Sequence, residues 1–279
     1  MNKLFLNTIL ALAVMNAAPT GNQISGGSDD RVIPFYRFGY EKGLQREMAI
    51  SYTNTTGVTG ELAIEFRDHT GKITEIPFKT GDGGVTRLKN MVTTLKPYTA
   101  GVFTTLSTGL PYQQGWLRVV TKPAGAVTVT ALARSRRDGE SEMHNYTLYP
   151  LSGQRVQTMG PFDDGSEDQF LLANNGAELD KVTMIVRTRA GVEACRTTVD
   201  VPAAHWYKVA ISQSLPCAAK SQGLLEVQSL NGRTVATIFV FPPSGGTIPM
   251  QPAQTAAATN VEEQLTDLWE RLKKSSGLK

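Results

Sequence analysis

The segment NTTGVTGELAIEFRDHTG, residues 54–71, alternates apolar and polar side chains along its centre. Leu62, Ile64 and Phe66 occupy every second position, and charged residues stand beside them. This period of two predicts a half-buried β-strand, because successive side chains of a strand point to opposite faces. Gly71 follows in RDHTGK, where we expect it to take the left-handed position of a hairpin loop.

Strand patterns of this kind fill most of the chain. They recur in GWLRVVT, AVTVTALA, HWYKVAI and RTVATIFVF, which begin at residues 115, 126, 205 and 233. The last segment is apolar on both faces, as expected of a central strand. Gly, Asn, Asp and Pro separate the segments at short intervals, and no long helical pattern interrupts them. The sequence therefore predicts an all-β protein built as a sandwich or barrel.

The two halves of the chain repeat one order of strands and turns. Asn54 aligns with Asn174 and, without a gap, Arg67 and Gly71 meet Arg187 and Gly191. Further matches place Pro97 on Pro202, Gly115 on Gly223 and Val127 on Val235. The first half carries an extra segment around residues 75–90. Ordered matches of this kind predict an internal duplication.

Motifs shared by both halves suggest a known family. Pro-Phe at 34–35 and 161–162 precedes a strand that ends in Asn, then a strand–Gly hairpin and a Gly-led strand. This order resembles tandem immunoglobulin-like β-sandwich modules of secreted proteins from environmental bacteria, acidobacteria especially. The resemblance covers about Arg31 to Met250 and implies two tandem sandwich domains and export. It implies no chemistry, since these modules have no settled function.

The N-terminus has the pattern of a secretory signal peptide. Lys3 precedes an apolar run from Leu4 to Met15, and small residues follow it. A retained N-terminal anchor is the alternative. No other apolar segment reaches the length of a membrane-spanning helix. The predicted organisation is a signal peptide at 1–21, a polar spacer at 22–30, β-sandwich modules at 31–153 and 154–250, a linker at 251–259 and a helix at 260–274.

The chain has two cysteines, Cys195 and Cys217. In the oxidising compartment that the signal peptide implies, we expect them to form a disulfide. Two buried thiols are the alternative for a cytosolic chain.

The C-terminal segment NVEEQLTDLWERLKK has helical spacing. Its apolar residues fall on one stripe, which consists of Val261, Leu265, Leu268, Trp269 and Leu272. An isolated helix of this length is marginal in water, so we expect it to dock. Its own sandwich, a second copy of the chain and a separate partner are the alternatives, so that the helix could form a homo-oligomer or bind a partner protein.

Candidate chemistry is sparse. The three histidines, His69, His144 and His205, stand in no catalytic spacing, so we expect no enzyme and no cofactor. The segment FDDGSED, residues 162–168, is an acidic loop with oxygen ligands of the kind that calcium takes, at Asp163, Asp164, Glu167 and Asp168. It lacks the spacing of a calcium-binding loop. A solvated turn is the favoured interpretation of this loop, so no metal is expected.

Trp116 and Trp206 are the candidate ligand aromatics. Each shares its strand face with a cation, Arg118 or Lys208, so an exposed platform for a glycan or peptide is one interpretation. Burial under a loop or against the other sheet is the favoured one.

The formal net charge of +3 is too small for a nucleic-acid binder. The sequence therefore predicts a secreted, non-enzymatic binding or structural protein of the cell surface or periplasm. A carbohydrate-binding module and an assembly subunit that uses the tail helix are the alternatives.

Overall fold

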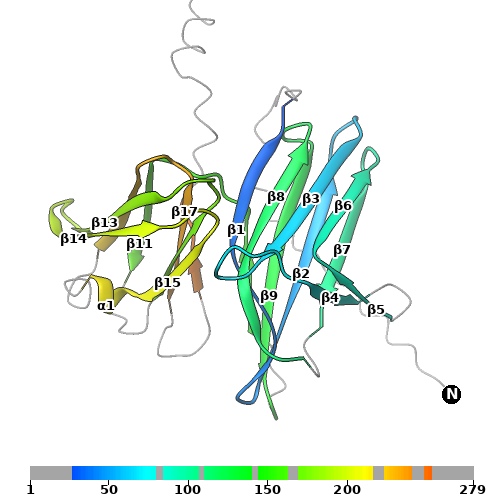
Figure 1. Ribbon diagram of the computed structural model, residues 1–279, viewed down its shortest axis with the longest axis horizontal. Helices are drawn as coiled ribbons and strands as arrows, with labels where there is room; N and C mark the ends of the chain where they lie inside the picture. Colours follow the sequence, from blue (N-terminus) through cyan, green and yellow to red (C-terminus); the bar gives the residue numbers. More distant parts are fainter. Residues whose placement is uncertain are drawn as a thin grey trace, which may run out of the picture.

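The computed structural model describes residues 27–79, 84–106, 110–139, 144–162, 169–215, 223–240 and 248–252. These residues form strands β1–β18 and a four-residue helix, α1 (Ile211–Ser214). The protein is thus all-β, as the alternating patterns predicted. Strands β1–β10 make a first unit and β11–β18 a second, and the two lie side by side (Figure 1).

The first unit consists of two sheets. Sheet I has the order β1-β8-β3-β6, and sheet II has the order β5-β4-β7-β2-β9-β10. The end of β1 also pairs with β2, which links the sheets. The strands are β1 (Asp29–Glu41), β2 (Leu44–Asn54), β3 (Gly60–Arg67), β4 (Ile76–Lys79), β5 (Val85–Leu88), β6 (Asn90–Leu95), β7 (Ala100–Thr105), β8 (Gln113–Lys122), β9 (Val127–Arg137) and β10 (His144–Leu148).

The second unit also consists of two sheets. Sheet III has the order β11-β16-β13-β14, and sheet IV has the order β15-β12-β17-β18. Its strands are β11 (Val156–Phe162), β12 (Gln169–Asn174), β13 (Asp180–Thr188), β14 (Glu193–Val201), β15 (Trp206–Ala210), β16 (Gly223–Ser229), β17 (Thr234–Val240) and β18 (Ile248–Met250).

Both units use one pairing order. Sheet III repeats sheet I strand for strand, and sheet IV repeats the β7-β2-β9-β10 part of sheet II. A register shift interrupts β1 between Ile33 and Tyr36, and β11 at the matching place. Strands β4 and β5 have no counterpart among the described strands of the second unit, and they lie where the sequence shows an extra segment.

The strand pairs correct two of the sequence matches. Asn54 pairs with Val127 of β9, whereas Asn174 pairs with Thr234 of β17. If Asn54 matches Asn174, then Val127 matches Thr234, and Val235 matches Thr128. In the same way, the pairing of β2 with β7 and of β12 with β15 matches Ala100 with Trp206. Counting back three residues from this match places Pro97 opposite the residue after Pro202. Each match is one residue out. The error matters because a shift of one residue moves a side chain to the other face of the sheet.

Two further expectations need correction. The predicted polar spacer at 22–30 ends too late, because β1 already begins at Asp29 and pairs with Thr121 of β8. Ile211 was expected to continue the strand of Tyr207, but it begins α1 and is buried there. The signal peptide and the tail helix lie outside the described residues, as does most of the linker.

The matched asparagines join the two sheets of each unit. Asn54 and Asn174 are fully buried. The side-chain amide of Asn54 donates to the carbonyls of Val58, Leu95 and Lys96, at 2.7, 3.1 and 3.2 Å. That of Asn174 donates to the matching carbonyls at 2.8, 2.9 and 3.1 Å. In each case the side-chain oxygen accepts a backbone N–H two residues on, as in an Asx turn.

We predict that Asn174→Asp destabilises the protein severely. The substitution replaces an amide donor with a carboxylate oxygen that faces three carbonyl oxygens in a buried site. The loss should exceed about 2 kcal/mol of unfolding free energy, measured by urea denaturation. Asn145→Asp, an exposed change on β10, is the control and should stay within about 0.5 kcal/mol of the unmodified protein. Equal losses for the two variants would contradict this role of Asn174.

Candidate functional site

Sheet IV is buried on both faces. Phe170 and Leu172 of β12 point into the core of the second unit, together with Ala236 and Ile238 of β17. The residues between them face the other way and belong to the core of the first unit, namely Leu171, Ala173, Val235 and Phe239. Neighbouring side chains on β12 and β17 therefore pack into two different hydrophobic cores. Sheet IV lies between sheet III and the first unit.

Aromatic rings form the centre of this contact between the units. Phe35 of β1 stacks on Trp206 of β15, with ring centroids 5.8 Å apart and planes at 17°. Phe35 also meets Phe239 edge to face at 5.0 Å, and Tyr146 of β10 meets Phe239 at 5.6 Å. Edge-to-face and offset pairs at these distances add to the energy of area burial. Figure 1 shows β1 beside β17 at this contact.

Polar bonds surround the aromatic centre. Asp30 accepts two hydrogen bonds from the Arg118 guanidinium, at 3.0 and 2.8 Å, and a third from Asn175 of the second unit at 2.9 Å. Burial alone would raise the pKa of Asp30. The bonds from Arg118 and Asn175, with the nearby charges of Arg118 and Arg233, outweigh it, so the pKa lies below its ordinary value. Ionised Asp30 thus favours the contact between the units.

The turn after β3 makes a second polar contact with the second unit. The backbone N–H of Trp206 donates to the carbonyl of His69 at 3.1 Å. Gly71 has a φ of +81°, as the hairpin pattern predicted, and a Cβ there would lie 2.1 Å from the carbonyl oxygen of Ala204. Gly191, its counterpart, has a φ of +80° but no atom within 4 Å of such a Cβ. Gly71 therefore serves both the turn and the contact.

The interpretation of Trp116 and Trp206 as exposed ligand aromatics is wrong. Trp116 is fully buried, and the Arg67 guanidinium lies 5.5 Å from its ring centroid. Trp206 is 7% exposed because the face that it shares with Lys208 packs against the first unit. A single strand pattern cannot show that a second unit covers its polar-looking face. The contact that this packing forms is the part of the site that the sequence did not predict.

The sequence carries a signal for this contact, which appears when the two units are compared in the register that their strand pairs give. Outward positions of sheet II hold Ser51, Thr53 and Thr128. The matching positions of sheet IV hold Leu171, Ala173 and Val235, which pack on the first unit. Polar side chains in the first unit and apolar side chains at the matching positions of the second indicate which face is covered.

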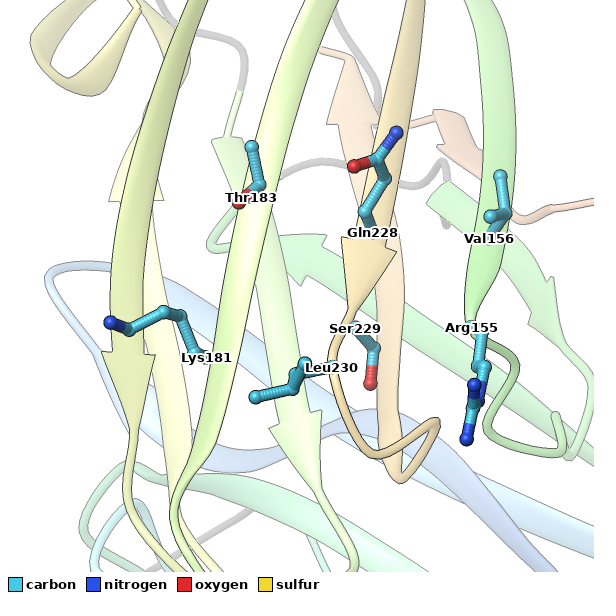
Figure 2. A pocket seen from close by; sticks show the side chains of 7 residues that line it. All are labelled: Arg155, Val156, Lys181, Thr183, Gln228, Ser229 and Leu230. Carbon is cyan, nitrogen blue, oxygen red and sulfur yellow. The ribbon is translucent and has the colours of Figure 1, made fainter.

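A shallow groove of about 430 Å³ lies on the outer face of sheet III (Figure 2). Arg155 and Lys181 stand at its opposite sides, and Val156 and Leu230 give it apolar walls. Ser229 also lines the groove and is buried, and its hydroxyl donates to the carboxylate of Asp180. Asp180 also accepts bonds from Thr234 and from the backbone of Asn231. This buried network fixes the strand ends that shape the groove.

The other candidate residues are not brought together. His69 lies in the contact turn, His144 begins β10, and His205 holds its ring nitrogen 2.9 Å from the carbonyl of Ala203. No group of three potential metal ligands occurs among the described residues. The acidic candidates Asp163, Asp164, Glu167 and Asp168 lie outside those residues, as do Val261, Leu265, Leu268, Trp269 and Leu272 of the tail helix.

Cys195 lies on β14 and is not a free thiol. Cys217 lies outside the described residues, so the pairing of the two cysteines stays a prediction. Within the described part of the chain, no helix is long and apolar enough to span a membrane.

Comparisons with known proteins give little further information. No family model matches the sequence, and no curated protein matches it. Among solved structures, the chain is similar to a "putative secreted protein" from Parabacteroides distasonis, at 12% identity and a TM-score of 0.21. The similarity covers 76% of this chain and 78% of that one. A TM-score this low does not establish a shared fold.

We predict that Gly71→Ala destabilises the protein more than Gly191→Ala. Both changes place a Cβ on a left-handed backbone, which costs roughly 1–2 kcal/mol. Only Gly71→Ala also forces a Cβ onto the Ala204 carbonyl of the other unit. Urea denaturation measures both losses, and limited proteolysis between the units should be faster for Gly71→Ala alone. Equal effects of the two variants would contradict the double role of Gly71.

We predict that Asp30→Asn flattens the acid dependence of stability. The unfolded carboxyl titrates near its ordinary value of 3.8, and the folded one lower. The stabilisation is therefore complete above about pH 4–5 and is lost as pH falls through the lowered folded pKa. Urea midpoints at pH 6 and pH 3 should show a weaker variant at pH 6 and a smaller difference at pH 3. Asp200→Asn, an exposed change on β14, is the control. Parallel profiles for Asp30→Asn and the unmodified protein would refute the assignment.

Proposed function

We propose that this chain is an exported, non-enzymatic protein of the cell surface or periplasm, built of two immunoglobulin-like β-sandwich modules that arose by duplication. The identical pairing order of the two units supports the duplication. The signal-peptide pattern supports export. The three histidines, which stand in no catalytic spacing, fit a binding or structural role.

The observation that carries the proposal is the buried aromatic contact between the units. Phe35, Trp206 and Phe239 leave little surface to solvent, at 4%, 7% and 3% exposure. A contact of this kind holds the modules in one orientation, whereas separate modules on a flexible linker would show polar facing surfaces. Persistent geometry suits a protein that presents a surface or separates two attachment points.

The groove on sheet III is the surface that we propose for binding. Arg155 and Lys181 offer positive charge beside the apolar side chains of Val156 and Leu230. Val156 and Leu230 are 54% and 72% exposed. Such a surface fits an acidic protein or glycan of the cell envelope, since charge steers the partner and apolar area holds it. Recruitment of a partner through the helix at 260–274 stays a separate prediction.

Fractionation of a bacterium that expresses the full chain with a C-terminal tag tests export. We expect the chain outside the cytoplasm, with a mass that shows the loss of N-terminal residues within 1–21. Recovery of the full-mass chain in the cytoplasm would contradict export.

Cosedimentation of the purified protein with isolated cell envelopes tests binding. The double variant Arg155→Glu/Lys181→Glu should lose most of the envelope-bound fraction, because it reverses the charge of the groove. Lys79→Glu on β4, an exposed lysine of the first unit, is the control and should bind as before. Equal binding of the double variant and the control would show that the groove is not the binding surface.

A further inference from the structure

Three cations gather where the first unit meets β15 of the second. Arg37 comes from β1, Arg46 from β2 and Lys208 from β15. Arg37 and Arg46 lie close enough to act electrostatically on each other and on Lys208. Burial and the charge of Arg37 hold the pKa of Arg46 below its ordinary value. Glu41 is the carboxylate beside this group, 3.5 Å from Nη1 of Arg46 and 42% exposed.

Three donor atoms of this group lack acceptors. Nε of Arg37, and Nε and Nη1 of Arg46, are buried and have no hydrogen-bond partner among the described residues. The Arg46 side chain is only 12% exposed. Both guanidinium groups instead lie over rings: Arg46 over Tyr112 at 4.6 Å, and Arg37 over Tyr146 at 5.3 Å. Ring stacking holds a guanidinium by its face and leaves its edge N–H groups free to bind a ligand.

A phenol lies beside the same two cations. Tyr146 is 7% exposed; the Arg37 side chain lies within reach of its hydroxyl oxygen, and no described residue accepts its proton. Burial raises the pKa of Tyr146 to about 12, so the hydroxyl is protonated at neutral pH and can donate. A buried hydroxyl whose proton has no acceptor is costly unless a ligand accepts from it.

Other arginines of the protein show that this arrangement is unusual here. Arg118, Arg187 and Arg196 each hold a carboxylate oxygen within 2.5–2.8 Å. Arg37 and Arg46 instead lie near each other, and the Glu41 carboxylate is 3.5 Å from Arg46, farther than in those three pairs. Repulsion between two half-buried like charges, added to their desolvation, opposes folding unless an anion compensates it.

We propose that Arg37, Arg46 and Tyr146 form a binding site for an oxyanion group, a carboxylate or a phosphate, with Lys208 at its rim. Guanidinium edges bind such groups in bidentate fashion, and the phenol adds a third donor. Because Lys208 belongs to the second unit, the bound anion connects both units and should stabilise their contact. The site lies apart from the groove on sheet III and does not depend on the proposed function.

Titration of the full chain with inorganic phosphate tests the site. We expect saturable binding by calorimetry, and a thermal midpoint that rises with phosphate but not with sodium chloride at equal ionic strength. Arg46→Gln should weaken phosphate binding about tenfold or more, because charge-assisted hydrogen bonds are lost. Arg196→Gln removes an equal charge from exposed β14 and should leave phosphate binding unchanged.

Parallel titrations with acetate show which oxyanion the site prefers, and saturable binding of either anion at this site supports the proposal. If Arg46→Gln does not fold, Lys208→Gln at an exposed position tests the site instead. It should weaken binding by a smaller factor. No saturable binding of phosphate or acetate to the unmodified protein would overturn the proposal. Unchanged phosphate affinity in both Arg37→Gln and Lys208→Gln would overturn it as well.

Discussion

The double burial of sheet IV is the constraint on which the rest of the structure depends. Side chains on one face of β12 and β17, such as Phe170 and Ile238, fill the second unit. Side chains one position away, such as Leu171 and Phe239, fill the contact with the first. Neither set can be exposed without loss of apolar burial, at about 25 cal/mol for each Å². The orientation of the units therefore follows from the composition of two strands.

The two units share a strand-pairing order but differ where they meet. Both keep a buried asparagine that bonds to the opposite sheet, and both keep a left-handed glycine after the matching strand. Gly71 touches the other unit, whereas Gly191 faces open space. The outward face of sheet IV is apolar at the positions where sheet II carries Ser and Thr. The residues common to both units maintain the fold, and the differences between the units specify the contact.

Charges at the edge of the contact fall into two kinds. Asp30 is matched by Arg118 and Asn175, so its carboxylate is fully bonded and stabilises the contact. Arg37 and Arg46 lie near the same contact with buried donors that no described residue accepts. The low dielectric of the interior strengthens a satisfied hydrogen bond and raises the cost of an unsatisfied donor. The bonds of Asp30 therefore stabilise the fold, whereas the free donors of Arg37 and Arg46 suit a ligand.

The sequence by itself determined the local structure of this protein. Alternation fixed the strand over Leu62 to Phe66, and glycine chemistry fixed the turn at Gly71, because backbone sterics act within a few residues. Tertiary structure decided which faces are covered. Trp206 stands beside Lys208 on its strand, a pattern that fits either solvent or a neighbouring unit, and only the packing of Phe35 upon it distinguishes the two. The residue-by-residue match of the two units was also decided there, because hydrogen bonds between strands set the pairing, while sequence similarity allowed a slip of one residue.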